Sequence, residues 1–99
     1  MSTVRKLNES ALRGIYDAYM HEAFPPAELK PLAVMLRLME RGRYLCYGYY
    51  RNGRLAAYAF FYRHDSRVLL LDYFAVTPEL RGRGVGSAFL AALDAVLSG

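Results

Sequence analysis

Chemistry is concentrated in the stretch LDYFAVTPELRGRGVGSAFL, which runs from position 71 to position 90. Small and basic residues alternate in its centre, in the order Arg81, Gly82, Arg83, Gly84, Val85 and Gly86. Glycine adopts backbone conformations closed to other residues and lets a ligand approach the main chain. The free N–H groups and the positive dipole end of the helix predicted after this turn favour an anion. Arg81 and Arg83 add charge-assisted hydrogen bonds, so the turn has the chemistry of a pyrophosphate cradle.

Two common nucleotide-binding motifs do not fit this turn. The dinucleotide motif G-x-G-x-x-G fails because Ser87 stands where its last glycine is required. The phosphate-binding motif G-x-x-x-x-G-K-S/T fails because no lysine follows Gly86. Glycine-rich turns between a strand and a helix also occur for close packing alone, and the spacing by itself does not separate the two cases. The apolar strand before the turn and the apolar helix after it favour a ligand.

The same residues resemble the GNAT superfamily of N-acetyltransferases. The hallmark of that family, R/Q-x-x-G-x-G/A, is matched at every fixed position by RGRGVG, Arg81–Gly86. The strand ending FAV at 74–76, the TP step and the helix that begins SAFL also match the acetyl-CoA site of the family. The resemblance covers residues 71–90 in motif and essentially the whole chain in predicted topology.

The resemblance implies acetyl-CoA as the cofactor, with its pyrophosphate on the main chain of Arg81–Ser87. The exposed backbone near Phe74 and Val76 would pair with the pantetheine arm as an added strand does, and an N–H near Val76 would face the thioester oxygen. A primary amine would attack the acetyl carbon directly after a base had removed its proton. The implied cofactor-binding residues are Phe74, Val76, Arg81, Gly82, Arg83, Gly84, Val85, Gly86 and Ser87.

Asp72 is the candidate general base, because it interrupts an apolar strand at a position where the family often carries an acidic residue. The alternative is a structural carboxylate on a strand face, paired with an arginine such as Arg63 or Arg67. His21 and Glu22 stand near the end of the first predicted helix, where members of the family form one wall of the acceptor site. A surface role is the simpler interpretation for both of these residues.

The N-terminal part of the chain predicts one strand followed by two helices. The strand covers Thr3–Leu7, and the capping residues NES at 8–10 begin the first helix. The segment FPP at 24–26 ends that helix because proline blocks its continuation. The second helix starts near Leu29–Pro31 and stops at Gly42.

The rest of the chain predicts a three-stranded meander and a last helix. Strands over Tyr44–Tyr50 and Leu55–Tyr62 are joined by a tight Asn-Gly turn at 52–53. A third strand covers Arg67–Val76, and its apolar core, Val68–Leu71, is typical of a strand covered on both faces. The last helix begins after the glycines, at Val85. The order β-α-α-β-β-β-α predicts helices packed on an antiparallel sheet, in an α+β or mixed α/β domain.

Length and composition predict a single globular domain of 99 residues with a modest core. Hydrophobic residues make up 55% and charged residues 22% of the chain, which excludes a disordered protein. We see no apolar run of membrane-spanning length and no signal peptide. The single cysteine, Cys46, excludes an internal disulfide and fits a reducing cytoplasm. Cysteine and histidine do not stand at metal-ligand spacing, so no metal site is predicted.

The net charge of +4 is carried mostly by arginine, which favours an anionic ligand. An aromatic-rich sheet with basic residues is also the pattern of a protein that stacks single-stranded nucleic acid. Arginine is concentrated at one helix entrance and is not spread among the sheet aromatics, which disfavours nucleic acid. The predicted partner is a small-molecule or peptide amine acceptor, with no role for a membrane.

The family fold continues with a strand beside the cofactor strand, another helix and a final hairpin, none of which the sequence holds. We therefore expect a truncated acetyltransferase domain over residues 1–99. The missing strands would otherwise come from a complementing C-terminal segment or from a second copy in a homo-oligomer. A non-catalytic CoA-binding or assembly fragment is the alternative. Without those strands, the predicted strand Arg67–Val76 would expose an edge and an apolar surface.

Overall fold

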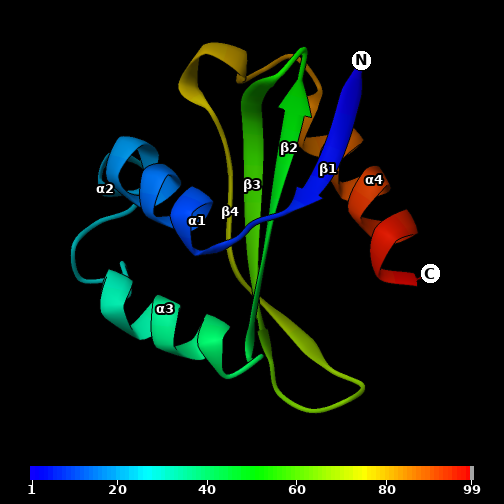
Figure 1. The fold of residues 1–99 in the computed structure, drawn as a ribbon. Helices are drawn as coiled ribbons and strands as arrows, with labels where there is room; N and C mark the ends of the chain where they lie inside the picture. Colours follow the sequence, from blue (N-terminus) through cyan, green and yellow to red (C-terminus); the bar gives the residue numbers. More distant parts are fainter. Residues whose placement is uncertain (99) are drawn as a thin grey trace.

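A four-stranded antiparallel sheet forms the centre of the computed structural model, which describes residues 1–98. The strands lie in the sheet in the order of the chain, so each pairs with its sequence neighbours (Figure 1). Their bounds are β1 Ser2–Lys6, β2 Tyr44–Arg51, β3 Arg54–Arg63 and β4 Leu69–Val76. The sheet therefore has two edges, β1 and β4, and the strand that leads into the glycine-rich turn is one of them.

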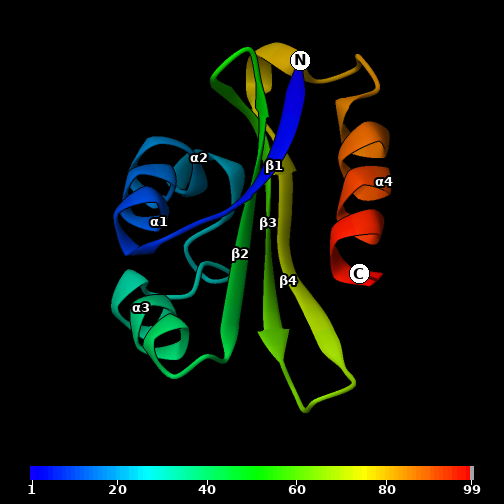
Figure 2. The ribbon, with the colours of Figure 1, turned by 45° about the vertical axis from the view of Figure 1, so that its right-hand side comes forward.

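Helices cover both faces of this sheet (Figure 2). On one face lie α1 Glu9–Ile15, the π-helix η1 Tyr16–Met20, α2 His21–Ala23 and α3 Leu32–Glu40. On the other lies α4 Val85–Ser98, which the short 3-10 helix η2 Pro78–Leu80 precedes. The predicted order is confirmed, although the first predicted helix is a run of three helical segments. Among residues 1–98, no helix is both long enough and apolar enough to cross a bilayer.

Local sequence signals explain where the first elements begin and end. The Asn8 side chain caps α1 by accepting a hydrogen bond from Ala11 N at 2.9 Å. Phe24 is extended, with φ −132° and ψ 139°, and the prolines after it keep the chain out of the helix. Gly42 ends the α3 region with a φ of +71°, as its type predicts. Asn52 and Gly53 both have positive φ, so the β2–β3 hairpin has its predicted tight turn.

Alternation along β2 and β3 divides the core between the two faces of the sheet. Tyr44 and Cys46 of β2 pack toward α1–α3, whereas Leu45 and Tyr47 pack toward α4. The core on the α1–α3 face consists of Leu7, Leu12, Ile15, Tyr16, Met20, Met35, Tyr44, Cys46, Tyr58, Phe60 and Tyr73. The core on the α4 face consists of Leu45, Tyr47, Tyr49, Ala56, Ala57, Ala59, Val85, Phe89 and Leu93. Both central strands are therefore buried on both faces.

The first half of β4 differs from its prediction. Val68–Leu71 was expected to be covered on both faces, and this is wrong: Leu70 and Leu71 are 50% and 54% exposed. The strand begins at Leu69 and pairs only with β3, so its other edge meets no strand within residues 1–98. The start of β4 also extends beyond the C-terminal end of α4, so no helix covers the α4 face of the sheet there (Figure 2). An apolar run in the sequence therefore does not distinguish a central strand from this edge strand.

An irregularity in the β3–β4 ladder changes the direction of Asp72. Phe60 pairs with Tyr73 and the next residue, Phe61, pairs with Leu71, so Asp72 is an extra residue in β4. Such a bulge re-aims side chains. It brings the Asp72 side chain to the α1–α3 face, which Tyr73 also occupies.

Tyr73 and Asp72 then hold the segment between α2 and α3. The Tyr73 hydroxyl donates to Glu28 O and accepts from Lys30 N, both at 2.7 Å. Lys30 Nζ lies 3.3 Å from an Asp72 oxygen, and Lys30 O accepts from the Tyr16 hydroxyl at 2.9 Å. We call this set, Tyr16, Glu28, Lys30, Asp72 and Tyr73, the loop clamp. It fixes α2 and α3 relative to the edge strand.

We expect Tyr73→Phe to lower the free energy of unfolding by about 1–3 kcal/mol, because Glu28 O and Lys30 N both lose their partner. Urea denaturation followed by circular dichroism measures the change. The matched control is Tyr62→Phe, which removes a hydroxyl from a partly buried tyrosine of β3 outside the loop clamp. Equal midpoints for Tyr73→Phe and the wild type would show that the clamp does not stabilise the fold.

Candidate functional site

The turn between β4 and α4 requires glycine at two positions. Gly82 has φ +78° and Gly84 has φ +75°, both in the left-handed region that other residues avoid. Around both, no other group among the described residues lies within 4 Å of the position that a Cβ would take. The main chain at these two glycines is therefore uncovered by other parts of the chain. We call residues 81–87 the glycine-arginine turn.

The N-terminus of α4 presents main-chain donors to this turn. The first hydrogen bond into the helix runs from Ala88 N to Gly84 O at 3.1 Å. The N–H groups of Val85, Gly86 and Ser87 precede it and have no intrahelical partner. The first turn of α4 holds no acidic residue. The helix start therefore favours binding of an anion, because it has free N–H donors, the positive end of the helix dipole and no competing carboxylate.

Two aromatic contacts fix the helix that carries these donors. Phe89 is fully buried and stacks on Tyr49 at 5.1 Å and on Phe74 at 5.5 Å between ring centroids. Val85, at the first helical position, is 2% exposed. Gly86 faces β4, where a Cβ would lie 3.6 Å from a methyl group of Val76, an ordinary contact. The helix start is therefore held against the end of β4 by packing.

Arg81 and Arg83 lie on different sides of the turn. Arg81 folds back over the end of β4, and its Nε donates to Val76 O at 3.3 Å. Arg83 lines a separate hollow of about 560 Å³, formed by the β2–β3 hairpin end, the first two residues of the chain and η2 with its Glu79. The structure thus places one guanidinium group at the strand end and the other near the hairpin, and they do not share a pocket.

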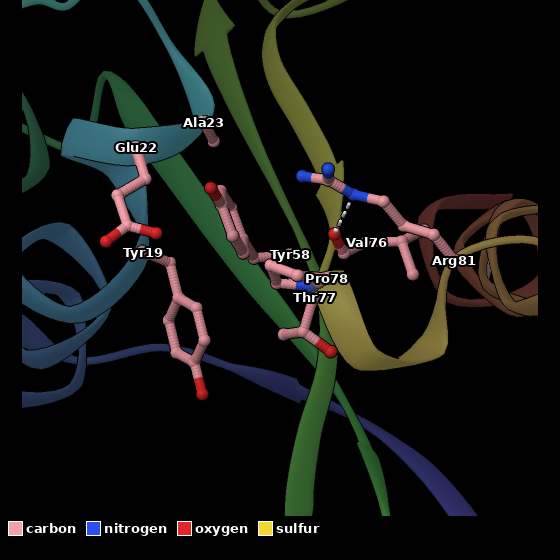
Figure 3. Close-up of a pocket in the computed structure, with 8 residues that line it drawn as sticks. All are labelled: Tyr19, Glu22, Ala23, Tyr58, Val76, Thr77, Pro78 and Arg81. Atoms are coloured by element: carbon pink, nitrogen blue, oxygen red, sulfur yellow. Dashed lines mark hydrogen bonds between the residues drawn. The ribbon is translucent and has the colours of Figure 1, made fainter.

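A smaller pocket of about 260 Å³ opens on the α1–α3 side of the strand end. We call it the tyrosine pocket; its lining includes Tyr19, Glu22, Tyr58, Thr77, Pro78 and Arg81. Figure 3 shows that these residues come from the η1–α2 run, from β3 and from the segment after β4. Glu22 is the one acidic residue in this lining, and His21 is not part of it.

Tyr58 is the unusual member of the tyrosine pocket. Its residue is 1% exposed, and its hydroxyl has no hydrogen-bond partner within residues 1–98. Burial raises the pKa of Tyr58 to about 12, while the nearby Arg81 guanidinium acts in the opposite direction. The phenol is therefore a neutral donor at neutral pH, and the pocket lining contains a buried hydroxyl that no protein group satisfies.

Thr77 sets the position of the strand end. Its N–H and its hydroxyl both donate to Ala56 O, at 2.9 and 3.2 Å, and the residue is 1% exposed. Ala56 is itself an extra residue in β3, since Tyr49 pairs with Ala57 and Tyr50 with Leu55. In the sequence, Thr77 is marked only by the TP step, and Tyr58 only by its place among the many aromatic residues of two strands.

The candidate base Asp72 lies outside the lining of the tyrosine pocket. It belongs to the loop clamp, where it pairs with Lys30 and also accepts a hydrogen bond from the Tyr44 hydroxyl. Pairing with Arg63 or Arg67 was wrong, because the bulge turns the carboxylate to the face where Lys30 lies. Burial, then the hydrogen bond to Asp72, raises the pKa of Tyr44. The role of Asp72 as a base stays a prediction.

Comparison with known proteins agrees with this geometry. The family model for the acetyltransferase (GNAT) family matches residues 10–98. The chain belongs to the GNAT family. Among solved structures, it is similar to the ribosomal-protein-S18-alanine N-acetyltransferase of Escherichia coli, with 26% identity and a TM-score of 0.72. A putative GNAT acetyltransferase from Bacteroides thetaiotaomicron shares the fold at 18% identity and a TM-score of 0.80.

This GNAT chain is shorter than those neighbours. The matches cover 98% and 95% of it, but only 59% of the Escherichia coli chain and 55% of the Bacteroides chain. A predicted acetyltransferase from Clostridium acetobutylicum, solved with acetyl-CoA, matches 99% of this chain and 74% of its own, at 12% identity and a TM-score of 0.67. A comparison with curated protein sequences finds no match.

The raised pKa of Tyr58 predicts a pH dependence of stability. Because the folded-state pKa of about 12 exceeds the usual value, the native state holds its proton longer than the unfolded state. The contribution of the protonated Tyr58 phenol to the free energy of unfolding is fully present below about pH 10 and is lost as the pH rises toward 12. We expect Tyr58→Phe to reduce the loss of stability over that interval. Urea denaturation at several alkaline pH values measures it, and identical slopes would contradict the burial of the phenol.

Proposed function

We propose that this protein is an acetyl-CoA-dependent N-acetyltransferase that acts on a primary amine. One observation carries the proposal: in a GNAT chain, free amides at the start of α4 follow two left-handed glycines at the end of an edge strand. Acetyl-CoA, when bound, supplies the acetyl group as an activated thioester. The chain's own residues bind and orient the two substrates.

The residues present fit this cofactor. The bare main chain of the glycine-arginine turn, with the donors of Val85, Gly86 and Ser87, would hold its pyrophosphate. The free edge of β4, near Phe74 and Val76, would pair with its pantetheine arm in the manner of an added strand.

The amine acceptor would enter from the opposite face of the sheet. The tyrosine pocket opens there, at the same strand end, and Glu22 gives it a carboxylate that attracts an ammonium group. The Escherichia coli neighbour is named for transfer to an alanine of a ribosomal protein, which is also a primary amine. Acetyl-CoA and the amine would thus bind on opposite faces of the sheet, both at the end of β4.

A second function, CoA binding without transfer, is favoured by one observation. The chain spans 59% or less of the two neighbours reported first, and the outer edge of β4 is uncovered within the described residues. In the active protein, the part of this edge that precedes Phe74 would be completed by a further segment or by a second copy. Binding of acetyl-CoA with no release of CoA in the presence of amines would identify the non-catalytic function.

Replacing both arginines of the turn should weaken acetyl-CoA binding. We expect Arg81→Ala combined with Arg83→Ala to raise the Kd of acetyl-CoA about 100-fold, because two positive charges beside the proposed pyrophosphate site are lost. Isothermal titration calorimetry measures the change, and pantetheine, which lacks the phosphates, should bind both proteins equally. The control replaces two exposed arginines remote from the turn, Arg13 and Arg67. Unchanged affinity in the double variant would show that the two arginines do not contribute to binding of the pyrophosphate.

The role of Asp72 can be separated from its structural contacts. If it is the base, Asp72→Asn lowers the rate of acetyl transfer about 100-fold and leaves the Kd of acetyl-CoA unchanged. The rate is followed by release of the CoA thiol. Lys30→Met is the control, because it breaks the ion pair and keeps the carboxylate. Equal rates in both variants would assign Asp72 to the loop clamp alone.

A further inference from the structure

The Tyr58 hydroxyl points to a ligand. Buried polar groups in folded proteins are almost always hydrogen-bonded, and an exception needs an explanation. Tyr58 is 1% exposed, lines the tyrosine pocket, and its hydroxyl is unpartnered within residues 1–98. A phenylalanine would fill the same space without an unsatisfied group. The hydroxyl is therefore accounted for by a molecule in the pocket that pairs with it.

One acidic and one basic side chain, Glu22 and Arg81, line the pocket together with this hydroxyl. In Figure 3 the Tyr58 oxygen lies between the Glu22 carboxylate and the Arg81 guanidinium group. Glu22 and Arg81 make no ion pair with each other in the described chain. Arg81 uses its Nε on Val76 O, which leaves its two terminal nitrogens to donate elsewhere. The pocket thus offers an acceptor for a cation on one side and donors for an oxygen on the other.

The size of the pocket limits what it can hold. Its volume of about 260 Å³ lies below the range of roughly 300–1,000 Å³ that is typical of drug-sized ligands. A head group of one small residue fits such a space. Ala23 and Tyr19 line the pocket on the side formed by η1 and α2.

We propose that the tyrosine pocket recognises an α-amino group whose neighbouring carbon carries a carbonyl, as in an amino acid or the amino terminus of a peptide. Glu22 binds the ammonium group, and Tyr58 and Arg81 donate to the carbonyl or carboxylate oxygen. This inference rests on the proposed function and deepens it, because it names the class of amine. Tyr58 and Glu22 are then the specificity-determining residues of the acceptor site.

The test compares four amines on the chain saturated with CoA. Alaninamide and trialanine carry an α-amine beside a carbonyl, whereas Nα-acetyl-lysine amide and propylamine do not. Calorimetry should give a Kd about tenfold lower or better for the first pair. Free alanine is added as a fifth probe. Preference for alanine over trialanine identifies a free amino acid as the source, and the reverse preference identifies a peptide. Equal affinity for the lysine amide would overturn the proposal.

Variants separate recognition from a purely structural role. Tyr58→Phe should weaken alaninamide binding about tenfold while the midpoint of thermal unfolding stays equal or rises, because an unsatisfied buried group is removed. Glu22→Gln should weaken binding by a similar factor. The matched controls are Tyr62→Phe and the exposed Glu40→Gln, which should leave it unchanged. A loss of stability in Tyr58→Phe with unchanged binding would show that the hydroxyl serves the fold.

A parallel titration with acetyl-CoA distinguishes this inference from the proposed function. If acetyl-CoA binds and the four amines are not discriminated, the acceptor assignment fails and the cofactor site stands. If alaninamide binds through Tyr58 and acetyl-CoA does not bind, the pocket stands and the transferase function fails.

Discussion

The position at which β4 stops is the constraint on which the site depends. Thr77 donates twice to the carbonyl of Ala56, which an extra residue in β3 makes available. These two bonds replace the ladder at the point where proline can no longer continue it. The chain then leaves the sheet, passes through η2 and returns as α4 with its first turn beside Val76. A shift of this corner would displace the amide donors and the pocket together.

The strand end separates two chemical environments. On the α4 face, bare main chain and helix donors form a surface for an anion, built almost without side chains. On the α1–α3 face, side chains from η1, α2 and β3 form a small pocket with one carboxylate, one guanidinium group and one phenol. Arg81 reaches across to the second surface while its backbone belongs to the first. The pairing of a main-chain site with a side-chain site fits a family in which a cofactor is shared and acceptors differ.

Local sequence patterns predicted the helices, strands and turns. The partners of individual side chains could not be predicted, because they depend on contacts between segments distant in the sequence. The Asn52-Gly53 turn, the stop at Gly42 and the left-handed glycines follow from the conformations those residues allow. The partner of Asp72 could not be predicted, because an extra residue in the strand decides which face it occupies. The separation of Arg81 from Arg83 and the solitary hydroxyl of Tyr58 depend on how the turn folds back. Alternation in a sequence assigns faces, but it does not locate bulges.

The bulge at Asp72 also makes β4 a strand of two halves that are out of phase. Leu71 lies opposite Phe61, and Tyr73 lies opposite Phe60, although two residues along a regular strand share a face. Deleting that single position would restore an even alternation and leave both pairs as they are, with Leu71 still opposite Phe61. Such an insertion can therefore be gained or lost without turning over the side chains on either side of it. It adds one polar side chain to an otherwise apolar face and keeps the orientation of the rest of the strand.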